Sequence, residues 1–305
     1  MARKSRQTTG DRIFDLTNYV LLVVITILCI YPILYIVFAS LSDPIRLTAN
    51  RTFLWKPLGF TLEGYKLVFK DKGLLLGYAN TIFYVVVGVG VNMVFTCMGA
   101  FVLSRRNLYW KKAIMVMITI TMFFGGGLIP WFLVVKGLGM YNHWTALVFP
   151  FAINTWNMII MRTGFEAVPY ELEEAAKIDG AGDMYIFLRI ILPLSKAVLA
   201  VIVLYYTVGA WNSWFPSMIF LKDRKKFPLQ LLMRELLIMN DTSAVSQGGG
   251  TAMSGLNSGS FESTTAYREL VKYTTIVIAT FPIMVLYPFL QKYFVQGVYV
   301  GSLKG

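Results

Sequence analysis

The chain has 305 residues, of which 56% are hydrophobic and 14% are charged, and its formal net charge is +12. A soluble domain typically carries about 25% charged residues, so this composition excludes an ordinary soluble enzyme, a disordered chain and a nucleic-acid-binding protein. The two cysteines and the single histidine form neither a disulfide framework nor a metal-ligand pattern. The sequence therefore predicts a membrane protein with no metal site and no catalytic residues.

Six apolar stretches are long enough to cross a bilayer, which takes about 20 residues of helix. They cover about residues 19–40, 77–103, 113–135, 144–161, 194–220 and 273–290. Four basic residues between positions 3 and 12 resemble the start of a signal peptide. The stretch that follows them has about 22 residues, which exceeds the usual length of about 7–15, so we expect a retained first helix.

The turn between the second and third stretches, residues 104–112, sets the expected orientation. It holds four basic residues and no acidic one, which is typical of a cytoplasmic turn. Six crossings then leave both termini in the cytoplasm, as tails of residues 1–18 and 292–305, with a membrane domain over residues 19–291.

Two extracytoplasmic loops are expected, residues 41–76 and 216–272. The first mixes proline, glycine and aromatic residues and is expected to pack on the membrane domain. Near its start the second carries the basic run Lys222–Lys226, which is followed by an apolar-periodic stretch over residues 229–238. It ends in a glycine- and serine-rich run, residues 241–260, that is too polar to order without a partner.

The interiors of the six stretches contain no Asp, Glu, Arg or His. This argues against an ion-coupled carrier, which places ionisable groups at membrane depth. A carrier whose sodium site is built from backbone carbonyls is an alternative that this observation does not exclude. No phosphate-binding P-loop pattern occurs. Gly125, Gly126 and Gly127 indicate a break or a close-packing site in the third stretch. The energy for any transport must come from a partner.

The most polar internal stretch, residues 166–192, predicts two short helices joined by an elbow. Pro169 suits a first helical turn, Glu173 is placed to pair with Lys177, and Gly180 after Asp179 suits a helix end. The second helix places Phe187, Ile190 and Ile191 on its apolar side.

Small residues at this elbow, Ala175, Ala176 and Ala181, allow another protein surface to approach closely. The alternative is an interfacial loop that lies on the lipid headgroups. Such a loop would favour basic and large apolar residues, whereas acids and alanines dominate here. The residues therefore favour docking to a partner.

This segment resembles the EAA loop in the permeases of bacterial ABC importers. The sugar-importer form, EAA-x-x-DGA-x-x-x-x-x-F-x-x-I-x-LP, is matched at ten fixed positions over 20 residues: Glu174, Ala175, Ala176, Asp179, Gly180, Ala181, Phe187, Ile190, Leu192 and Pro193. The resemblance extends over nearly the whole chain. It looks closest to the second permease of oligosaccharide importers, the group that includes the maltose systems. Residues 126–130, 157–162 and 211–216 resemble the complex-polysaccharide branch of that group.

The resemblance implies an all-α, polytopic membrane protein with six transmembrane helices, the type I ABC-importer permease fold, and a cytoplasmic coupling helix. It implies that the elbow is seated in an ATPase subunit, with the coupling residues Glu174, Ala175, Ala176, Asp179, Gly180 and Ala181. Lys304 and Gly305 in the tail would reach between the ATPases, or else form an unbound terminus. Implied partners are a homologous second permease, two ATPase subunits that bind ATP and magnesium, an extracytoplasmic solute-binding protein, a carbohydrate and the lipid bilayer.

Aromatic rings and amides suit sugars, because rings stack on apolar sugar faces while amides bond to hydroxyls. The candidates for a substrate path are Asn154, Trp156, Asn157, Trp211, Asn212 and Trp214. The alternative is an interfacial aromatic belt with amide bonds between helices. In related permeases an outer loop reaches into the binding protein, which makes Gly248, Gly249, Gly250 and Ser254 candidates for that contact.

The sequence therefore predicts the permease subunit of an ATP-driven oligosaccharide importer in the cytoplasmic (inner) membrane of a bacterium. Such a subunit is not an enzyme and holds no cofactor of its own. The alternatives are an ion-coupled secondary carrier, an ABC permease for amino acids or peptides, and a membrane scaffold. An amino-acid or peptide permease would carry a shorter EAA loop without the DGA and LP extensions.

Overall fold

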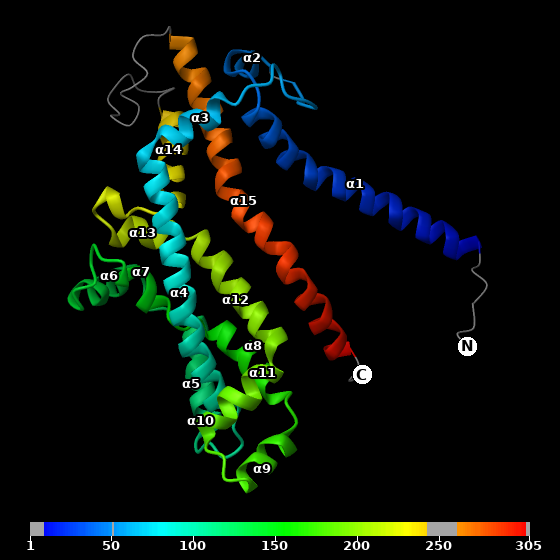
Figure 1. Ribbon diagram of the computed structural model, residues 1–305, viewed down its shortest axis with the longest axis vertical. Coiled ribbons are helices and arrows are strands. Elements are labelled where there is room, and N and C mark those ends of the chain that lie inside the picture. Colours follow the sequence, from blue (N-terminus) through cyan, green and yellow to red (C-terminus); the bar gives the residue numbers. More distant parts are fainter. Residues whose placement is uncertain (1–8, 51, 243–260, 303–305) are drawn as a thin grey trace. The chain divides into compact units, whose positions relative to one another are not determined.

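The computed structural model describes residues 9–50, 52–242 and 261–302, and within these ranges the regular structure is helical, with no strand. Figure 1 shows the helices in chain order. They are α1 (Thr9–Ser40), α2 (Pro44–Ala49), α3 (Glu63–Lys70), α4 (Lys72–Ser104), α5 (Lys111–Phe123), α6 (Leu128–Gly137), α7 (Thr145–Val148), η1 (Phe149–Phe151), α8 (Thr155–Glu166), α9 (Tyr170–Ile178), α10 (Asp183–Ile186), η2 (Phe187–Ile191), α11 (Leu192–Leu194), α12 (Lys196–Trp211), α13 (Phe215–Phe220), η3 (Arg224–Lys226), α14 (Leu229–Thr242) and α15 (Phe261–Ser302).

The chain divides into two compact units, one of residues 1–71 and 236–278 and the other of residues 72–235 and 279–305. In the first unit a small core forms around Ala39, Leu47 and Leu54, which are almost fully buried. Most of α1 is exposed along an apolar surface, which suits a helix whose surroundings are lipid.

In the second unit, α4, α8 and α12 pack together around one core. Ala100, Met161 and Ile202 from these three helices are fully buried. Gly164 on α8 allows the close approach of α12, because a Cβ added there would lie 2.6 Å from Cγ1 of Val198. The same core extends into residues 183–191 through Ile186, Phe187 and Ile191. The predicted coupling segment, residues 166–192, is therefore packed onto the bundle of α4, α8 and α12.

Two described helices, α1 and α4, are long and apolar enough to cross a membrane by length and composition. Two bent pairs raise the number to four if each pair is one span: α5 with α6, bent by 111°, and Asp183–Leu194 with α12, bent by 84°. The break predicted at the three glycines is confirmed. The helix α5 ends at Phe123, and Gly127 takes a φ of +82° before α6 begins, a conformation that glycine adopts easily.

Three of the expected crossings differ from the prediction. Residues 144–161 are α7, η1 and the start of α8 rather than one helix, because the side chain of Asn154 accepts a hydrogen bond from the backbone of Asn157 and starts α8 there. The stretch 194–220 is interrupted between α12 and α13. The long helix α15 extends well beyond the expected ends of the last stretch, residues 273–290, in both directions.

Candidate functional site

The elbow forms as its local sequence predicts. Pro169 precedes α9, which ends before Asp179, and Gly180 takes a φ of +81°. A hydrogen bond from the backbone N–H of Ala181 to the carbonyl of Ala176 closes the turn. This is the glycine-terminated helix end that the Asp179–Gly180 pair indicates.

Glu173 fastens α9 to the basic turn between α4 and α5. Its side chain is only 8% exposed and accepts hydrogen bonds from Arg105 and, at 2.8 Å, from Lys177. Arg105 also lies over the ring of Phe101, 4.5 Å from its centre. A carboxylate this buried needs charged partners, and Arg105 supplies one from a turn 68 residues away.

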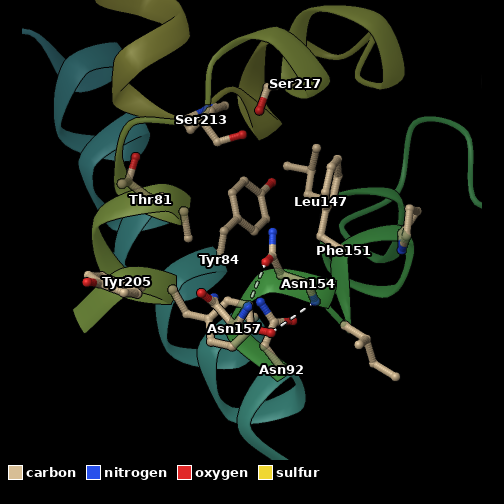
Figure 2. A pocket seen from close by; sticks show the side chains of 17 residues that line it. Thr81, Tyr84, Asn92, Leu147, Phe151, Asn154, Asn157, Tyr205, Ser213 and Ser217 are labelled. Atoms are coloured by element: carbon tan, nitrogen blue, oxygen red, sulfur yellow. Dashed lines mark hydrogen bonds between the residues drawn. The ribbon is translucent and has the colours of Figure 1, made fainter. Parts of the chain in front are cut away.

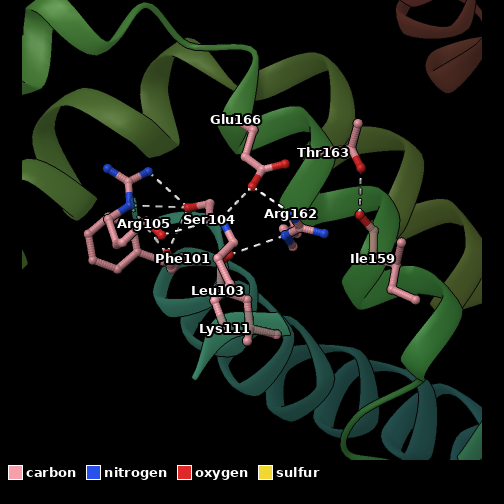
Figure 3. Close-up of polar contacts among 9 residues, drawn as sticks. All are labelled: Phe101, Leu103, Ser104, Arg105, Lys111, Ile159, Arg162, Thr163 and Glu166. Carbon is pink, nitrogen blue, oxygen red and sulfur yellow. Dashed lines mark hydrogen bonds and ion pairs between the residues drawn. The ribbon is translucent and has the colours of Figure 1, made fainter. Parts of the chain in front are cut away.

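A second carboxylate, Glu166, fastens the beginning of the same segment (Figure 3). One of its oxygens accepts hydrogen bonds from Lys111 at 2.9 Å and from Arg162 at 2.8 Å. The Nε atom of Arg162 donates to the carbonyl of Leu103 at 3.2 Å, so the contact also reaches the end of α4. The coupling segment is therefore clamped at two points to the residues around the α4–α5 turn.

These contacts change the titration of the groups involved. Burial tends to raise the pKa of the Glu166 carboxyl, but the hydrogen bonds from Lys111 and Arg162 outweigh burial and the pKa is lowered. The hydrogen bond to Glu173 raises the pKa of Lys177. Both groups therefore stay charged at neutral pH.

The elbow has an exposed tip, residues 174–180 apart from Ala176, and a base that Glu166 and Glu173 hold to the α4–α5 turn. Glu174, Ala175, Asp179 and Gly180 are exposed, and Ile178 is 86% exposed. By contrast, Ala176 and Ala181 are half-buried against the core. Four of the six coupling residues predicted from the sequence thus face outward. Ile178, a large apolar side chain on a polar helix, also lies at this tip, although it occupies an unspecified position of the EAA pattern.

A cavity of about 350 Å³ lies between α4, α8 and α12 in the same unit (Figure 2). On α4 its wall consists of Thr81, Tyr84, Gly88 and Asn92, which are three or four residues apart and so share one helix face. The rest of the wall is Leu147, Pro150, Phe151, Ile153, Asn154, Asn157, Tyr205, Tyr206, Gly209, Ala210, Ser213, Ser217 and Pro228.

Two of the six predicted path residues, Asn154 and Asn157, line this cavity. The hydroxyl of Tyr206 accepts a hydrogen bond from the backbone N–H of Asn154 at 3.0 Å and lies 2.6 Å from the hydroxyl of Thr96. Tyr206 thus fixes the start of α8 against α4. A tyrosine inside an otherwise apolar stretch was the signal that could have identified it.

The other four predicted path residues lie elsewhere. Trp211 is buried and donates from Nε1 to the carbonyl of Ala279 at 3.0 Å, so it joins α12 to α15. Asn212 ends α12 by donating to the carbonyl of Val208 at 3.0 Å. Trp214 lies 4.3 Å below the guanidinium of Arg234, and Trp156 is 60% exposed.

Two groups of predicted residues lie outside the described ranges: Gly248, Gly249, Gly250 and Ser254, and the tail residues Lys304 and Gly305. In the part of the chain that the structure describes, no three His, Cys, Asp or Glu side chains come close enough to hold a metal ion.

Comparison with known proteins places the chain among transport components. Residues 2–300 match the family described as the binding-protein-dependent transport system inner membrane component. Protein LplC of Bacillus subtilis strain 168 is 39% identical, over 98% of this chain and 97% of that protein. The polygalacturonan/rhamnogalacturonan transport system permease protein YtcP of the same strain is 37% identical, over 97% and 99%.

A solved structure agrees with these sequence matches. A chain from the crystal structure of a bacterial ABC transporter involved in the import of the acidic polysaccharide alginate is similar with a TM-score of 0.85 and 34% identity. The match covers 95% of this chain and 100% of that one.

Proposed function

The chain belongs to the family of inner membrane components of binding-protein-dependent transport systems, and we propose that it is the permease subunit of an ATP-driven carbohydrate importer. It would work with a homologous second permease, two ATPase subunits that bind ATP and magnesium, and an extracytoplasmic binding protein. This subunit itself breaks no covalent bond. The named relatives that transport polysaccharides and the amide- and hydroxyl-lined cavity support a carbohydrate cargo.

We infer six crossings with both termini in the cytoplasm, formed by α1, α4, the α5–α6 pair, α7 with α8, α12 and α15. The length of α4 supports this topology. Asn80, near its outer end, and Ser104, at its inner end, are 24 residues apart, or about 36 Å along a helix. A hydrocarbon core is about 30 Å thick, so the two ends of α4 would lie on opposite sides of the membrane.

One observation carries the coupling role: the elbow has an exposed tip on a clamped base. Glu173 and Glu166 hold the segment to the α4–α5 turn, while Glu174, Ala175 and Ile178 face outward. A partner pushing on the tip would then move the bundle through these contacts and the buried side chains of residues 186–191. An interfacial loop on lipid would not need a carboxylate pair to fix its orientation.

The test is Glu174→Lys in the assembled complex, reconstituted with its binding protein. Because Glu174 is exposed, the substitution should leave folding and subunit assembly intact. It should abolish ATP-driven sugar uptake by reversing a charge at the docking surface. Glu174→Asp keeps the charge and should retain most of the uptake. Wild-type uptake by the lysine variant would contradict the proposal.

A further inference from the structure

A basic turn lies at one end of the cavity, next to the face of α4 that lines it. This turn, residues 222–226, contains four cations and one acid. We propose that it forms, with the cavity, a binding site for the carboxylate groups of an acidic oligosaccharide. The inference rests on the proposed function and adds the charge class of the cargo.

The turn is attached to the cavity wall by the same residues that form the wall. Tyr84, which lines the cavity, donates from its hydroxyl to the carbonyl of Lys226 at 2.7 Å. Thr81, also a lining residue, accepts a hydrogen bond from the backbone N–H of Leu229 at 2.8 Å. Pro228, between these two contacts, is itself part of the wall. The turn is thus one edge of the cavity.

Further polar contacts fix the backbone of the turn. Asn80 donates from Nδ2 to the carbonyl of Lys225 at 2.8 Å. The side-chain oxygen of Asn142 accepts from the backbone N–H groups of Lys222 and Asp223 at 3.1 and 3.0 Å. Because the backbone of the turn is already fixed, the entropic cost of ligand binding falls on the lysine side chains alone.

Two of the four cations are exposed and have no acidic partner among the described residues. Lys226 donates from Nζ to the carbonyl of Asn142 at 2.7 Å, and Arg224 pairs with Glu235 at 3.2 Å. Lys222 and Lys225 are exposed, and neither forms an ion pair with any described residue. Asp223, whose carboxylate accepts the backbone N–H of Lys225 at 3.0 Å, offsets one of the four cations, so the turn keeps a formal net charge of +3. The turn therefore presents two free ammonium groups.

The cavity itself carries no charged side chain among the described residues. None of the 17 described residues that line it is charged, and its polar groups are amides and hydroxyls. Such groups can bond to sugar hydroxyls but leave a carboxylate uncompensated. The proposed topology puts the turn outside the membrane, although basic residues near span ends favour the inner side. An acidic cargo would account for the cations at this outer edge, while the uncharged lining would bind the sugar hydroxyls.

The probes are trigalacturonate and its fully methyl-esterified form, which shares the hydroxyl pattern but carries no charge. Binding of each labelled probe is measured by equilibrium dialysis with the full complex, in the absence of the binding protein. The variant is Lys222→Gln with Lys225→Gln, which leaves the backbone anchors of the turn in place. Lys66→Gln with Lys70→Gln on α3 is the matched control, because it removes two exposed cations from the other unit.

We expect the wild-type complex to prefer the acid, and the turn variant to bind it about three- to tenfold more weakly, since exposed ion pairs are individually weak. The turn variant should bind the ester as the wild type does. The control variant should bind both probes as the wild type does. Equal binding of acid and ester by the wild type, or no effect of the turn variant on the acid, would overturn the inference.

Uptake measured with the binding protein separates the remaining explanations. If the turn variant lowers ATP-driven uptake of acidic and neutral cargo alike, the turn binds the binding protein, and the inference is wrong. ATP-driven uptake of the ester in preference to the acid would overturn the charge assignment alone and leave the proposed function standing. Absence of ATP-driven uptake for every carbohydrate would instead refute the proposed function.

Discussion

Replacing Glu173 by Gln tests the clamp between the coupling segment and the α4–α5 turn. The substitution keeps the shape of the side chain but removes its charge, and it leaves Arg105, which is 17% exposed, without its carboxylate. Breaking a fully buried pair costs about 3–5 kcal/mol and an exposed one about 0.2–1 kcal/mol. The pair is mostly buried, and Lys177, at 38% exposed, adds little. We therefore expect a cost of about 2 kcal/mol.

That cost should appear as local opening of α9 rather than as global unfolding. A change of about 2 kcal/mol corresponds to about 30-fold in the opening equilibrium. The assay is hydrogen exchange by mass spectrometry on peptides covering Tyr170–Ile178, in the nucleotide-free complex. Protection there should fall about 30-fold, while Lys112→Gln, which removes an exposed cation beside the same turn, should leave it unchanged.

A double-mutant cycle isolates the pair itself. Arg105→Gln together with Glu173→Gln should cost clearly less than the sum of the two single changes, because no uncompensated charge remains. Strict additivity, or unchanged exchange in Glu173→Gln, would refute the clamp.

Three further expectations follow from single contacts. Tyr206→Phe removes the hydroxyl that accepts from the backbone of Asn154 and should cost about 1–3 kcal/mol, seen as a lower thermal midpoint of the purified complex; an unchanged midpoint would argue against its role. Gly164→Ala should reduce assembly of the complex, because its Cβ would overlap Val198. Adding Val198→Ala to this variant should restore assembly, and failure to do so would show that the overlap with Val198 is not the cause. The lowered pKa of Glu166 means that its contribution is present above its unfolded-state pKa of about 4.3 and is lost as pH falls through the lowered value. Exchange of the coupling segment, corrected for intrinsic rates, should therefore be flat from about pH 5 to 9 and rise below about pH 4; a change near pH 7 would contradict this assignment.

The elbow could be predicted from the sequence because its determinants are local. Pro169 before the helix and Gly180 after it act on their own backbone conformation, and the pair of Glu173 with Lys177 lies within one helix. The break at Gly127 was predictable for the same reason. Long helices without such signals, like α15, gave boundaries that were off by a dozen residues at each end.

Contacts between distant segments could not be predicted in the same way. The α4–α5 turn, which contains Arg105, and the acidic coupling segment are both predicted to be cytoplasmic. No signal in the sequence, however, pairs Arg105 with Glu173. Hydropathy likewise does not say which face of α12 meets a cavity. Its residue type therefore makes Trp211 a candidate for sugar stacking, whereas the structure shows it buried and bonded to Ala279. Tyr206 on the same helix lines the cavity, and hydropathy gives no sign of this.

The most direct test asks what the tip of the elbow touches. After replacement of Cys29 and Cys97, the two cysteines of the chain, Ala175→Cys is labelled with a short photo-reactive cross-linker in the intact complex. We expect a cross-link to an ATPase subunit whose yield changes when ATP is added, and no such product from Lys112→Cys. Adducts of Ala175→Cys with lipid alone, with and without ATP, would contradict it.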